Sequence, residues 1–374
     1  MTGNSELPLS DVDCSPPGGV FAGRKTLSVM LTYACPAQCT SCGTGSSPHD
    51  PHFLELDVVL TGIREASALN FENVVFTGGE ATLRWSDLLT ALRLTRSLRL
   101  PSRLVTNAHW AKTACLARDG LDALMEAGLN EINFSTGDEH SRFIPLENVI
   151  FATVAAVERE LTAYIMVELR SERRISQADI LEHPMIRALP EVQRARVKPT
   201  ESPWMPLNPF KVESYPEGVA INAGNLASCA GCDSVLQTYV MQADGRVGAC
   251  CGLGMRLIPE LSVGTCQGND LLQRAIQAAE EDFLKVWVHY QGPEHVLAWA
   301  AQHDPNIKWE NMYGHRCQAC LRLYKDERVR RVVREHHHEM MSTVLQTAWL
   351  REYFIPDKLT NTGAPTHSAS VQPS

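Results

Sequence analysis

The sequence predicts an α/β protein, with an open, partial (β/α)6 barrel followed by a smaller α+β extension. The first observation is that strand-like and helix-like segments alternate about six times over residues 26–200, as they do in a parallel sheet covered by helices. The second is that this alternation stops after residue 200, where residues 201–227 are irregular and hold four prolines. Six units are too few for a closed eightfold barrel, so an open barrel is expected.

Short apolar or β-branched runs predict the strands of this barrel, and segments with a period near 3.6 residues predict its helices. Gly128 is expected to end one of these helices as a left-handed cap. The predicted strands are Leu27–Thr32, Asn73–Thr77, Arg103–Thr106, Glu131–Ser135, Thr162–Leu169 and Val192–Val197. The predicted helices are Leu54–Ala68, Asp87–Ser97, Ala114–Ala127, Leu146–Glu160 and Gln177–Leu189.

The remainder of the chain has a different pattern. A β-hairpin is predicted over Gln237–Gly252, because Asp244-Gly245 is a strong turn signal. Helical periodicity then predicts helices over Asp270–Val288, His295–His303 and Cys317–Gln346. The predicted organisation is therefore a disordered lead-in over 1–25, the barrel over 26–200, a linker over 201–227, the extension over 228–350 and a disordered tail over 360–374.

Composition excludes several classes of partner. The net charge of −9 argues against nucleic acid as a partner, because proteins that bind nucleic acid generally present a basic face. The sequence has no run of about 18 apolar residues, which argues against a membrane-spanning helix. Residues 1–17 are polar and acidic and do not resemble a secretory signal, so a cytoplasmic location is expected.

Twelve cysteines occur in this chain, which is expected to stay in a reducing compartment. Metal ligands, reactive thiols or packed thiols are therefore better interpretations than disulfides. Cys14 and Cys115 stand alone, and they are expected to lie in an unstructured tail and in a buried helix, respectively. The three-histidine run at residues 336–338 is expected at the surface, where it could bind adventitious metal.

Three cysteines follow the first predicted strand with the spacing C-x3-C-x2-C, at Cys35, Cys39 and Cys42. Three thiolates in a short loop can bind three irons of a cubane cluster and leave the fourth iron free for a small molecule. A structural zinc site usually takes four ligands in two separated pairs, which this spacing does not match. The loop therefore favours an iron–sulfur cluster with one open iron.

This triad, together with Gly78-Gly79-Glu80 after the second predicted strand, resembles the radical S-adenosylmethionine (SAM) superfamily. The resemblance implies that the triad binds a [4Fe–4S] cluster and that SAM chelates its free iron. Reductive cleavage of SAM would then give a 5′-deoxyadenosyl radical that abstracts hydrogen from a substrate C–H bond. Where the family often has an aromatic residue before the third cysteine, this chain has Ser41, which puts that adenine contact in doubt.

The same resemblance implies further contacts to SAM at the ends of the strands. The glycines are expected to let backbone approach the methionyl part, and Glu80 is expected to accept from its ammonium group. The remaining predicted cofactor-binding residues are Asn107, Ser135 and Arg142, the last as a partner for the SAM carboxylate.

The later cysteines resemble the start of the SPASM/Twitch extension of radical SAM enzymes, in its shorter Twitch type. The resemblance implies one auxiliary [4Fe–4S] cluster on Cys232, Cys250, Cys317 and Cys320, with Cys229 as the alternative ligand. A structural zinc ion is the competing interpretation, because two C-x2-C pairs suit a tetrahedral site. Cys251 and Cys266 are left over, either as hydrogen-atom donors to a substrate radical or as packed thiols.

Three functions are open at this point. The first is maturation of a ribosomally synthesised peptide, with a separate protein presenting the peptide because no leader-binding domain fits before the first strand. The second is a dehydrogenase, epimerase or dehydratase that acts on a sugar or an aminocyclitol. The third is a non-catalytic metal-binding protein. Either enzyme would need an electron donor such as flavodoxin or ferredoxin.

Overall fold

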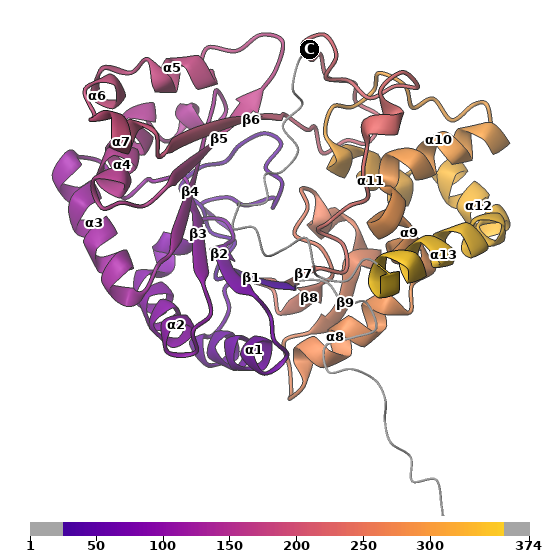
Figure 1. Ribbon diagram of the computed structural model, residues 1–374, viewed down its shortest axis with the longest axis horizontal. Coiled ribbons are helices and arrows are strands. Elements are labelled where there is room, and N and C mark those ends of the chain that lie inside the picture. The colour runs from indigo at the N-terminus through magenta and orange to yellow at the C-terminus, as the bar shows by residue number, and fades with distance from the viewer. Residues whose placement is uncertain (1–24, 355–374) are drawn as a thin grey trace, which may run out of the picture.

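Residues 25–354 are described by the computed structural model (Figure 1). Their strands form one nine-stranded sheet in the order β6-β5-β4-β3-β2-β1-β7-β8-β9. Every pairing from β6 to β7 is parallel, and the pairings β7–β8 and β8–β9 are antiparallel. The bounds are β1 Thr26–Met30, β2 Asn73–Thr77, β3 Ser102–Thr106, β4 Glu131–Thr136, β5 Ala163–Leu169, β6 Val197–Pro203, β7 Thr238–Met241, β8 Arg246–Gly248 and β9 Ser262–Thr265.

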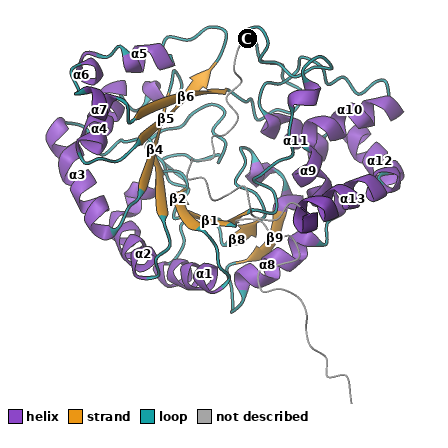
Figure 2. Cartoon of the chain, in the orientation of Figure 1, coloured by secondary structure: helices purple, strands orange, loops and turns teal. Residues whose placement is uncertain are grey.

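The helices of the first half lie on the outer side of the curved sheet (Figures 1 and 2). The sheet does not close, so the expected open, partial barrel is confirmed. Gly128 caps α3 with a left-handed φ of 117°, as predicted. The helices are α1 Leu56–Ala68, α2 Trp85–Ser97, α3 Ala114–Ala127, α4 Leu146–Glu158, α5 Gln177–Leu181, α6 Pro184–Arg187 and α7 Glu191–Arg194.

The core lies between the sheet and these helices. Strand residues that alternate along β2, β3 and β4 are fully buried, among them Phe76, Leu104 and Phe134. The helix α4 is buried along nearly its whole length, which its apolar sequence explains. Burying each large apolar side chain contributes about 1.5–3 kcal/mol, so this layer holds the loops at the strand ends in place.

The hairpin predicted around Asp244-Gly245 is present as β7 and β8. Its first strand also pairs in parallel with β1, with Thr26 opposite Thr238, so the hairpin continues the barrel sheet. The helices that follow are α8 Leu271–Glu280, α9 Phe283–Gln291, α10 Pro293–His303, α11 Arg316–Lys325, α12 Glu327–His336 and α13 His338–Phe354. Short 3-10 turns are η1 Ala81–Arg84, η2 His140–Arg142, η3 Leu226–Ser228, η4 Met255–Leu257 and η5 Pro259–Leu261.

Several predicted element boundaries were wrong. The strand expected over Val192–Val197 is the helix α7 followed by β6, because Pro190 starts a helical turn and the strand begins at Val197. The two long helices expected later in the chain are divided at acidic residues. Asp282 accepts from two backbone N–H groups of α9, and Asp326 accepts from one of α12, so each begins a new helix. The helix expected over Gln177–Leu189 is likewise divided, into α5 and α6.

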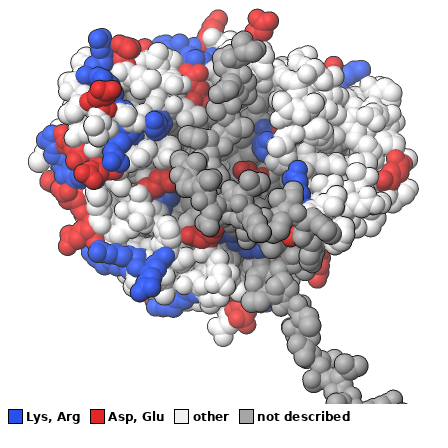
Figure 3. All heavy atoms as spheres, viewed as in Figure 1, with Lys and Arg blue, Asp and Glu red and all other residues white. Residues whose placement is uncertain are grey.

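Some predictions fall outside the described residues, namely Cys14, almost all of the lead-in over 1–25 and the tail over 360–374. Among the described residues, no helix is both long and apolar enough to cross a membrane. Acidic and basic side chains are interspersed over the barrel helices on the face shown in Figure 3. The division into barrel, linker and extension stays a proposal.

Candidate active site

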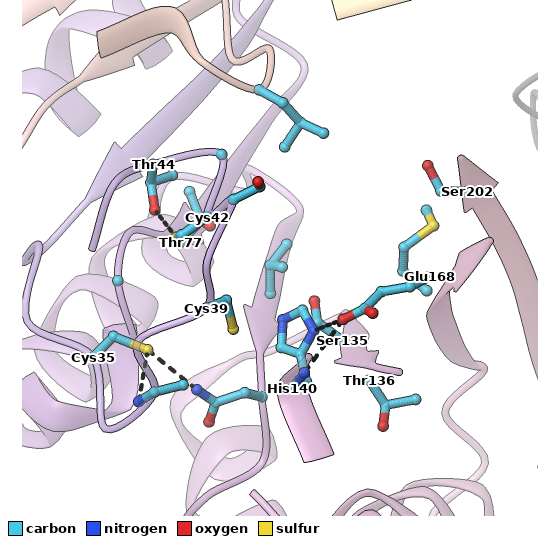
Figure 4. A pocket seen from close by; sticks show the side chains of 18 of the residues that line it. Cys35, Cys39, Cys42, Thr44, Thr77, Ser135, Thr136, His140, Glu168 and Ser202 are labelled. Atoms are coloured by element: carbon cyan, nitrogen blue, oxygen red, sulfur yellow. Dashed lines mark hydrogen bonds and ion pairs between the residues drawn. The ribbon is translucent and has the colours of Figure 1, made fainter. Parts of the chain in front are cut away.

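The cysteine triad lies in the loop between β1 and α1. This loop folds back on itself, because Thr32 pairs with Phe53 and the Cys35 N–H donates to the Ser47 carbonyl at 3.1 Å. Figure 4 shows Cys35, Cys39 and Cys42 along one side of a cavity at the ends of the strands. Parallel barrels place their binding sites at this end, so the loop lies where the fold predicts a site.

The cavity has a volume of about 250 Å3. The three thiols line it together with the ends of β2, β3, β4 and β5. The wall that the linker and the extension contribute includes apolar side chains, among them Trp204, Met205 and Leu253. The predicted residues that line the cavity are Cys35, Cys39, Ser41, Cys42, Gly78, Gly79, Glu80, Asn107 and Ser135.

The environment of Cys35 fits a cluster ligand. Its sulfur accepts from the Ala37 N–H at 3.4 Å and from the Asn107 amide at 3.5 Å (Figure 4). Burial raises the pKa of Cys35 and of Cys39 to about 12, so neither ionises readily in the bare protein. A bound metal cluster deprotonates coordinating thiols, and N–H donors to the sulfurs adjust its potential. The donor set therefore fits an iron–sulfur cluster.

Gly78 and Gly79 have a local packing role that their motif does not reveal. A Cβ at Gly79 would lie under 3.0 Å from the carbonyls of Tyr33 and Ala34, and one at Gly78 would meet the carbonyl of Thr32 equally closely. Gly78 also has φ +133°, which L side chains rarely adopt. The glycines therefore let the β2 loop pack against the cysteine loop. Their contact with SAM stays a prediction.

Glu80 is buried and accepts four hydrogen bonds from the protein itself. One oxygen accepts from Thr82 N at 3.2 Å, from the Thr82 hydroxyl at 2.6 Å and from the Thr106 hydroxyl at 2.8 Å. The other accepts from Asn107 N at 2.8 Å. This carboxylate ties the end of β2 to the end of β3 and holds the residue whose amide reaches Cys35. Its contact with an ammonium group stays a prediction.

Arg142 does not line the cavity. Its guanidinium is half exposed and lies 3.2 Å from Glu139 and 3.4 Å from the Thr40 hydroxyl. Glu139 also accepts from Thr40 N at 3.1 Å, so the pair braces the middle of the cysteine loop. The pairing of Arg142 with the SAM carboxylate stays a prediction.

A pair formed by buried Glu168 and half-buried His140 is the part of the cavity that the motifs do not contain. Glu168 at the end of β5 accepts from His140 Nδ1 at 2.9 Å and from Glu139 N at 3.0 Å (Figure 4). Both side chains line the cavity. The one signal in the sequence is that each follows or ends a predicted strand. Thr44, Met166, Trp204, Met205 and Leu253 also line the cavity without any signal of their own.

Four later cysteines come together in the extension, from the loop before β7, the end of β8 and the first turn of α11. The pKa of the buried Cys250 thiol is raised first by burial and then by its cysteine neighbours, which are Cys232, Cys251, Cys317 and Cys320. The Gly252 N–H donates to Cys250 Sγ at 3.0 Å, and a Cβ at Gly252 would lie 3.0 Å from both Cys250 Sγ and Cys317 Sγ.

The other cysteines of the extension lie apart from this group or at its edge. The charged neighbours that act on Cys229 are Glu294 and Arg316, and no cysteine is among them. Cys251 is exposed, with its sulfur 3.2 Å from the Ser234 hydroxyl, and Cys266 is buried with its sulfur 3.7 Å from the Arg246 carbonyl. Neither Cys251 nor Cys266 lines the cavity.

The loop after Cys250 and Cys251 packs directly on the cysteine triad loop. Gly254 N–H donates to the Gly43 carbonyl at 2.7 Å. Leu253 covers Gly43, because a Cβ there would lie under 3.0 Å from the leucine side chain. Arg256 donates to the Thr44 carbonyl at 2.7 Å. The two groups of cysteines are therefore joined by one short stretch of chain.

Comparison with known proteins agrees with this geometry. Residues 29–136 match the model of the radical SAM superfamily. GTP 3′,8-cyclase of Edwardsiella ictaluri is 33% identical over 122 residues, and that of Pectobacterium atrosepticum is 32% identical over 124 residues. Each alignment covers 31% of this chain, and the chain spans 35% of the length of each of these relatives.

Solved structures with similar folds include a crystal structure of BtrN in complex with AdoMet and 2-DOIA. It has 12% identity, a TM-score of 0.44 and coverage of 74% of this chain and 91% of that chain. Streptococcus suis SuiB bound to S-adenosylmethionine has 17% identity, a TM-score of 0.35 and coverage of 70% and 65%. Residues 29–136, which carry the triad and the Gly-Gly-Glu motif, therefore match the radical SAM superfamily, whose enzymes use a [4Fe–4S] cluster and SAM.

Proposed function

We propose that this protein binds its [4Fe–4S] cluster through Cys35, Cys39 and Cys42, and that SAM lies beside it in the cavity. The observation that carries the proposal is that these three thiols line one side of a single cavity, and that no fourth cysteine of residues 25–354 lines it. When bound, the cluster and SAM supply a 5′-deoxyadenosyl radical that abstracts hydrogen from a substrate C–H bond.

The chain's own residues position and shield this chemistry. The Asn107 amide and the Ala37 N–H hold the Cys35 sulfur, and Glu80 holds Asn107 in turn. We assign Gly78, Gly79, Glu80, Asn107 and Ser135 to the SAM pocket because all line the cavity. Arg142 contacts Thr40 and Glu139 instead, so we assign it to the support of the cysteine loop. The apolar wall keeps water from the reacting atoms.

Formation of 5′-deoxyadenosine tests this proposal. Anaerobically reconstituted protein with a chemical reductant and SAM should release 5′-deoxyadenosine and methionine. Cys39→Ala should abolish the release. Cys115→Ala should leave it unchanged, because Cys115 is exposed on α3 and not buried as the sequence predicted. Equal release by both variants would contradict the assignment of the triad.

We further propose that Cys232, Cys250, Cys317 and Cys320 bind one auxiliary [4Fe–4S] cluster, with residues 228–350 forming a Twitch-like extension. A tetrahedral zinc site needs sulfurs about 3.8 Å apart, given Zn–S bonds of about 2.3 Å. Among the described residues, no three of these thiols have sulfurs within 4.8 Å of one another. A cubane spreads its thiolates over four irons, so the wider spacing supports the cluster over zinc.

For the substrate, we propose a side chain of a ribosomally synthesised peptide, presented by a separate protein. The apolar wall formed by Met166, Trp204, Met205 and Leu253 supports this choice, because it suits an apolar side chain and itself offers few hydrogen-bond partners to a polyhydroxylated substrate. The electron donor would be a flavodoxin or a ferredoxin. The described cysteines are all free thiols, which suits a reducing cytoplasm.

The second candidate is a sugar or an aminocyclitol, and the Glu168–His140 pair supports it because that pair could hold a hydroxyl. One experiment distinguishes the peptide substrate from the small-molecule substrate. The peptide fraction of a host extract should accelerate 5′-deoxyadenosine formation and lose this effect after protease treatment. An effect that survives the protease contradicts the peptide proposal and supports the small molecule.

A further inference from the structure

A cluster of two histidines and one glutamate lies where α10, α12 and α13 meet, outside the cavity described above (Figure 1). His303 ends α10, His336 ends α12, and Glu339 lies in the first turn of α13. His303 Nε2 is 3.3 Å from one oxygen of Glu339, and His336 Nδ1 is 3.0 Å from the other. All three possible ligand atoms lie within 4.8 Å of one another.

We propose that this cluster is a binding site for a divalent transition-metal ion, with Zn2+ as its best occupant. Zinc bonds of about 2.0–2.1 Å to nitrogen and oxygen place neighbouring ligands of a tetrahedron about 3.4 Å apart. The two observed separations are close to this value, although they reach different oxygens of Glu339, so rotation of the side chains can bring all three ligands onto one ion. Two imidazoles and one carboxylate leave a fourth position for water.

The ring arrangement favours one shared ion. The imidazoles of His303 and His336 are stacked, with centroids 4.4 Å apart and planes at 26°, so both turn a nitrogen towards the same carboxylate. The ring of Trp299 also contacts that of His303, with centroids 4.7 Å apart and planes at 59°. These contacts restrict the side chains before an ion binds, which lowers the entropy cost of binding.

Two nearby arginines are paired with an acidic side chain. Arg328 and Arg331 lie close to the cluster in sequence, and both pair with Asp304, at 3.7 and 3.0 Å. The carboxylate of Asp304 therefore offsets part of the positive charge that would otherwise repel a cation.

The histidine run does not act as a unit, in contrast to what its sequence suggests. His337 turns away, with Nδ1 3.1 Å from the Val333 carbonyl and its ring against Phe283. His338 is exposed and is not part of the three-residue group. The distant His303 completes the site instead, so His338 offers a matched control.

Metal binding at this position would join α10 to the junction of α12 and α13. The helix α10 also packs against α11, which carries Cys317 and Cys320. An ion that binds only the folded extension stabilises it by mass action. The site would therefore strengthen the framework around the auxiliary cysteines without touching the cavity.

Zinc binding to the cluster-loaded protein tests the proposal, because loaded cysteines cannot take up zinc. Added Zn2+ should bind in a 1:1 ratio, survive gel filtration and raise the melting temperature. His336→Ala and Glu339→Gln should each weaken binding by more than about 10-fold, whereas His338→Ala should bind like the wild type. Iron content, measured on every sample, shows that the variants are folded and loaded.

Two results would overturn the proposal. One is zinc content that is equal in the wild type and in His336→Ala, which would show an adventitious ion only. The other is zinc content that rises as iron is lost and ignores the histidine variants, which would assign the ion to the cysteines.

Discussion

The guanidinium of Arg256 lies 3.5 Å from the ring centre of Tyr33 and joins the extension to the start of the cysteine loop. The same group donates to the carbonyls of Thr44 and Gly45, at 2.7 and 3.3 Å, on the far side of Cys42. It also lies 3.5 Å from a carboxylate oxygen of Asp50. One side chain of the extension thus holds both ends of the loop that carries the triad.

Arg256→Ala should therefore loosen the cysteine loop. The change removes a cation–π contact and charged hydrogen bonds to carbonyls, so we expect a loss of about 2–3 kcal/mol in the free energy of unfolding. The triad should also retain less iron under limiting iron, and 5′-deoxyadenosine formation should fall with it. Denaturant unfolding and iron analysis measure the two effects.

Arg256→Lys is the informative comparison, because lysine keeps the charge but cannot form the planar fork. Its iron retention should lie between those of the wild type and Arg256→Ala. Arg187→Ala, at an exposed arginine that pairs only with exposed Glu182, should change stability by less than about 0.5 kcal/mol. If Arg256→Ala retained iron as well as Arg187→Ala does, the proposed support of the loop would be wrong.

Gly79→Ala should destabilise the protein and disturb the triad together. The added methyl group would meet the carbonyls of Tyr33 and Ala34 at a distance that real Cβ atoms do not show. Forcing the two loops apart should cost about 1–3 kcal/mol or more. Gly264→Ala is the control, because its Cβ would meet Ala275 and Val247 at an ordinary 3.8 Å. Thermal unfolding of the two variants measures the difference. Equal melting temperatures would show that the close approach of the two loops at Gly79 does not limit stability.

Glu80→Gln should weaken the link between the ends of β2 and β3. The amide keeps the shape of the side chain. Its NH2 group, however, replaces a carboxylate oxygen that accepts hydrogen bonds from N–H or O–H groups, so two donors would face each other. We expect a loss of about 1–3 kcal/mol in the free energy of unfolding. The altered hold on Asn107 should also change the spectrum of the cluster bound at Cys35. An unchanged melting curve would contradict the buried, fully bonded position of Glu80.

Replacement of single cysteines should distinguish Cys232 from Cys229. Cys232→Ser should lower the iron content from about eight to about four per chain, because it removes a ligand of the auxiliary cluster. Cys229→Ser should retain about eight, since the charged groups that act on the pKa of Cys229 are Glu294 and Arg316 and not the thiols of the group. Iron and sulfide counting after anaerobic purification measures both. The opposite pattern would exchange the roles of the two residues.

The features that the sequence predicted well are local ones. The spacing of Cys35, Cys39 and Cys42 and the turn at Asp244-Gly245 each depend on a few neighbouring residues, and the structure contains the expected loop and hairpin. The alternation of strands and helices predicted the open barrel because each unit carries its own periodicity.

Long-range relationships were not predictable in this way. Nothing in the residues of β7 indicates that it pairs with β1, some 200 residues earlier, because parallel pairing leaves no local signal. The packing of Leu253 on Gly43 and the Glu168–His140 pair also join residues far apart in the sequence, so they leave no local signal either. The divided helices could have been found, since Asp282 and Asp326 are good N-cap residues that periodicity alone overlooks.

The most direct test of the account is the electron paramagnetic resonance spectrum of the reduced triad cluster with and without SAM. A variant in which Cys232, Cys250 and Cys317 are all serine isolates that cluster. Addition of SAM should shift its signal, because an iron without a protein ligand accepts the cosubstrate. A signal that is unchanged by saturating SAM, in protein with about four irons, would contradict the open iron on which the whole proposal depends.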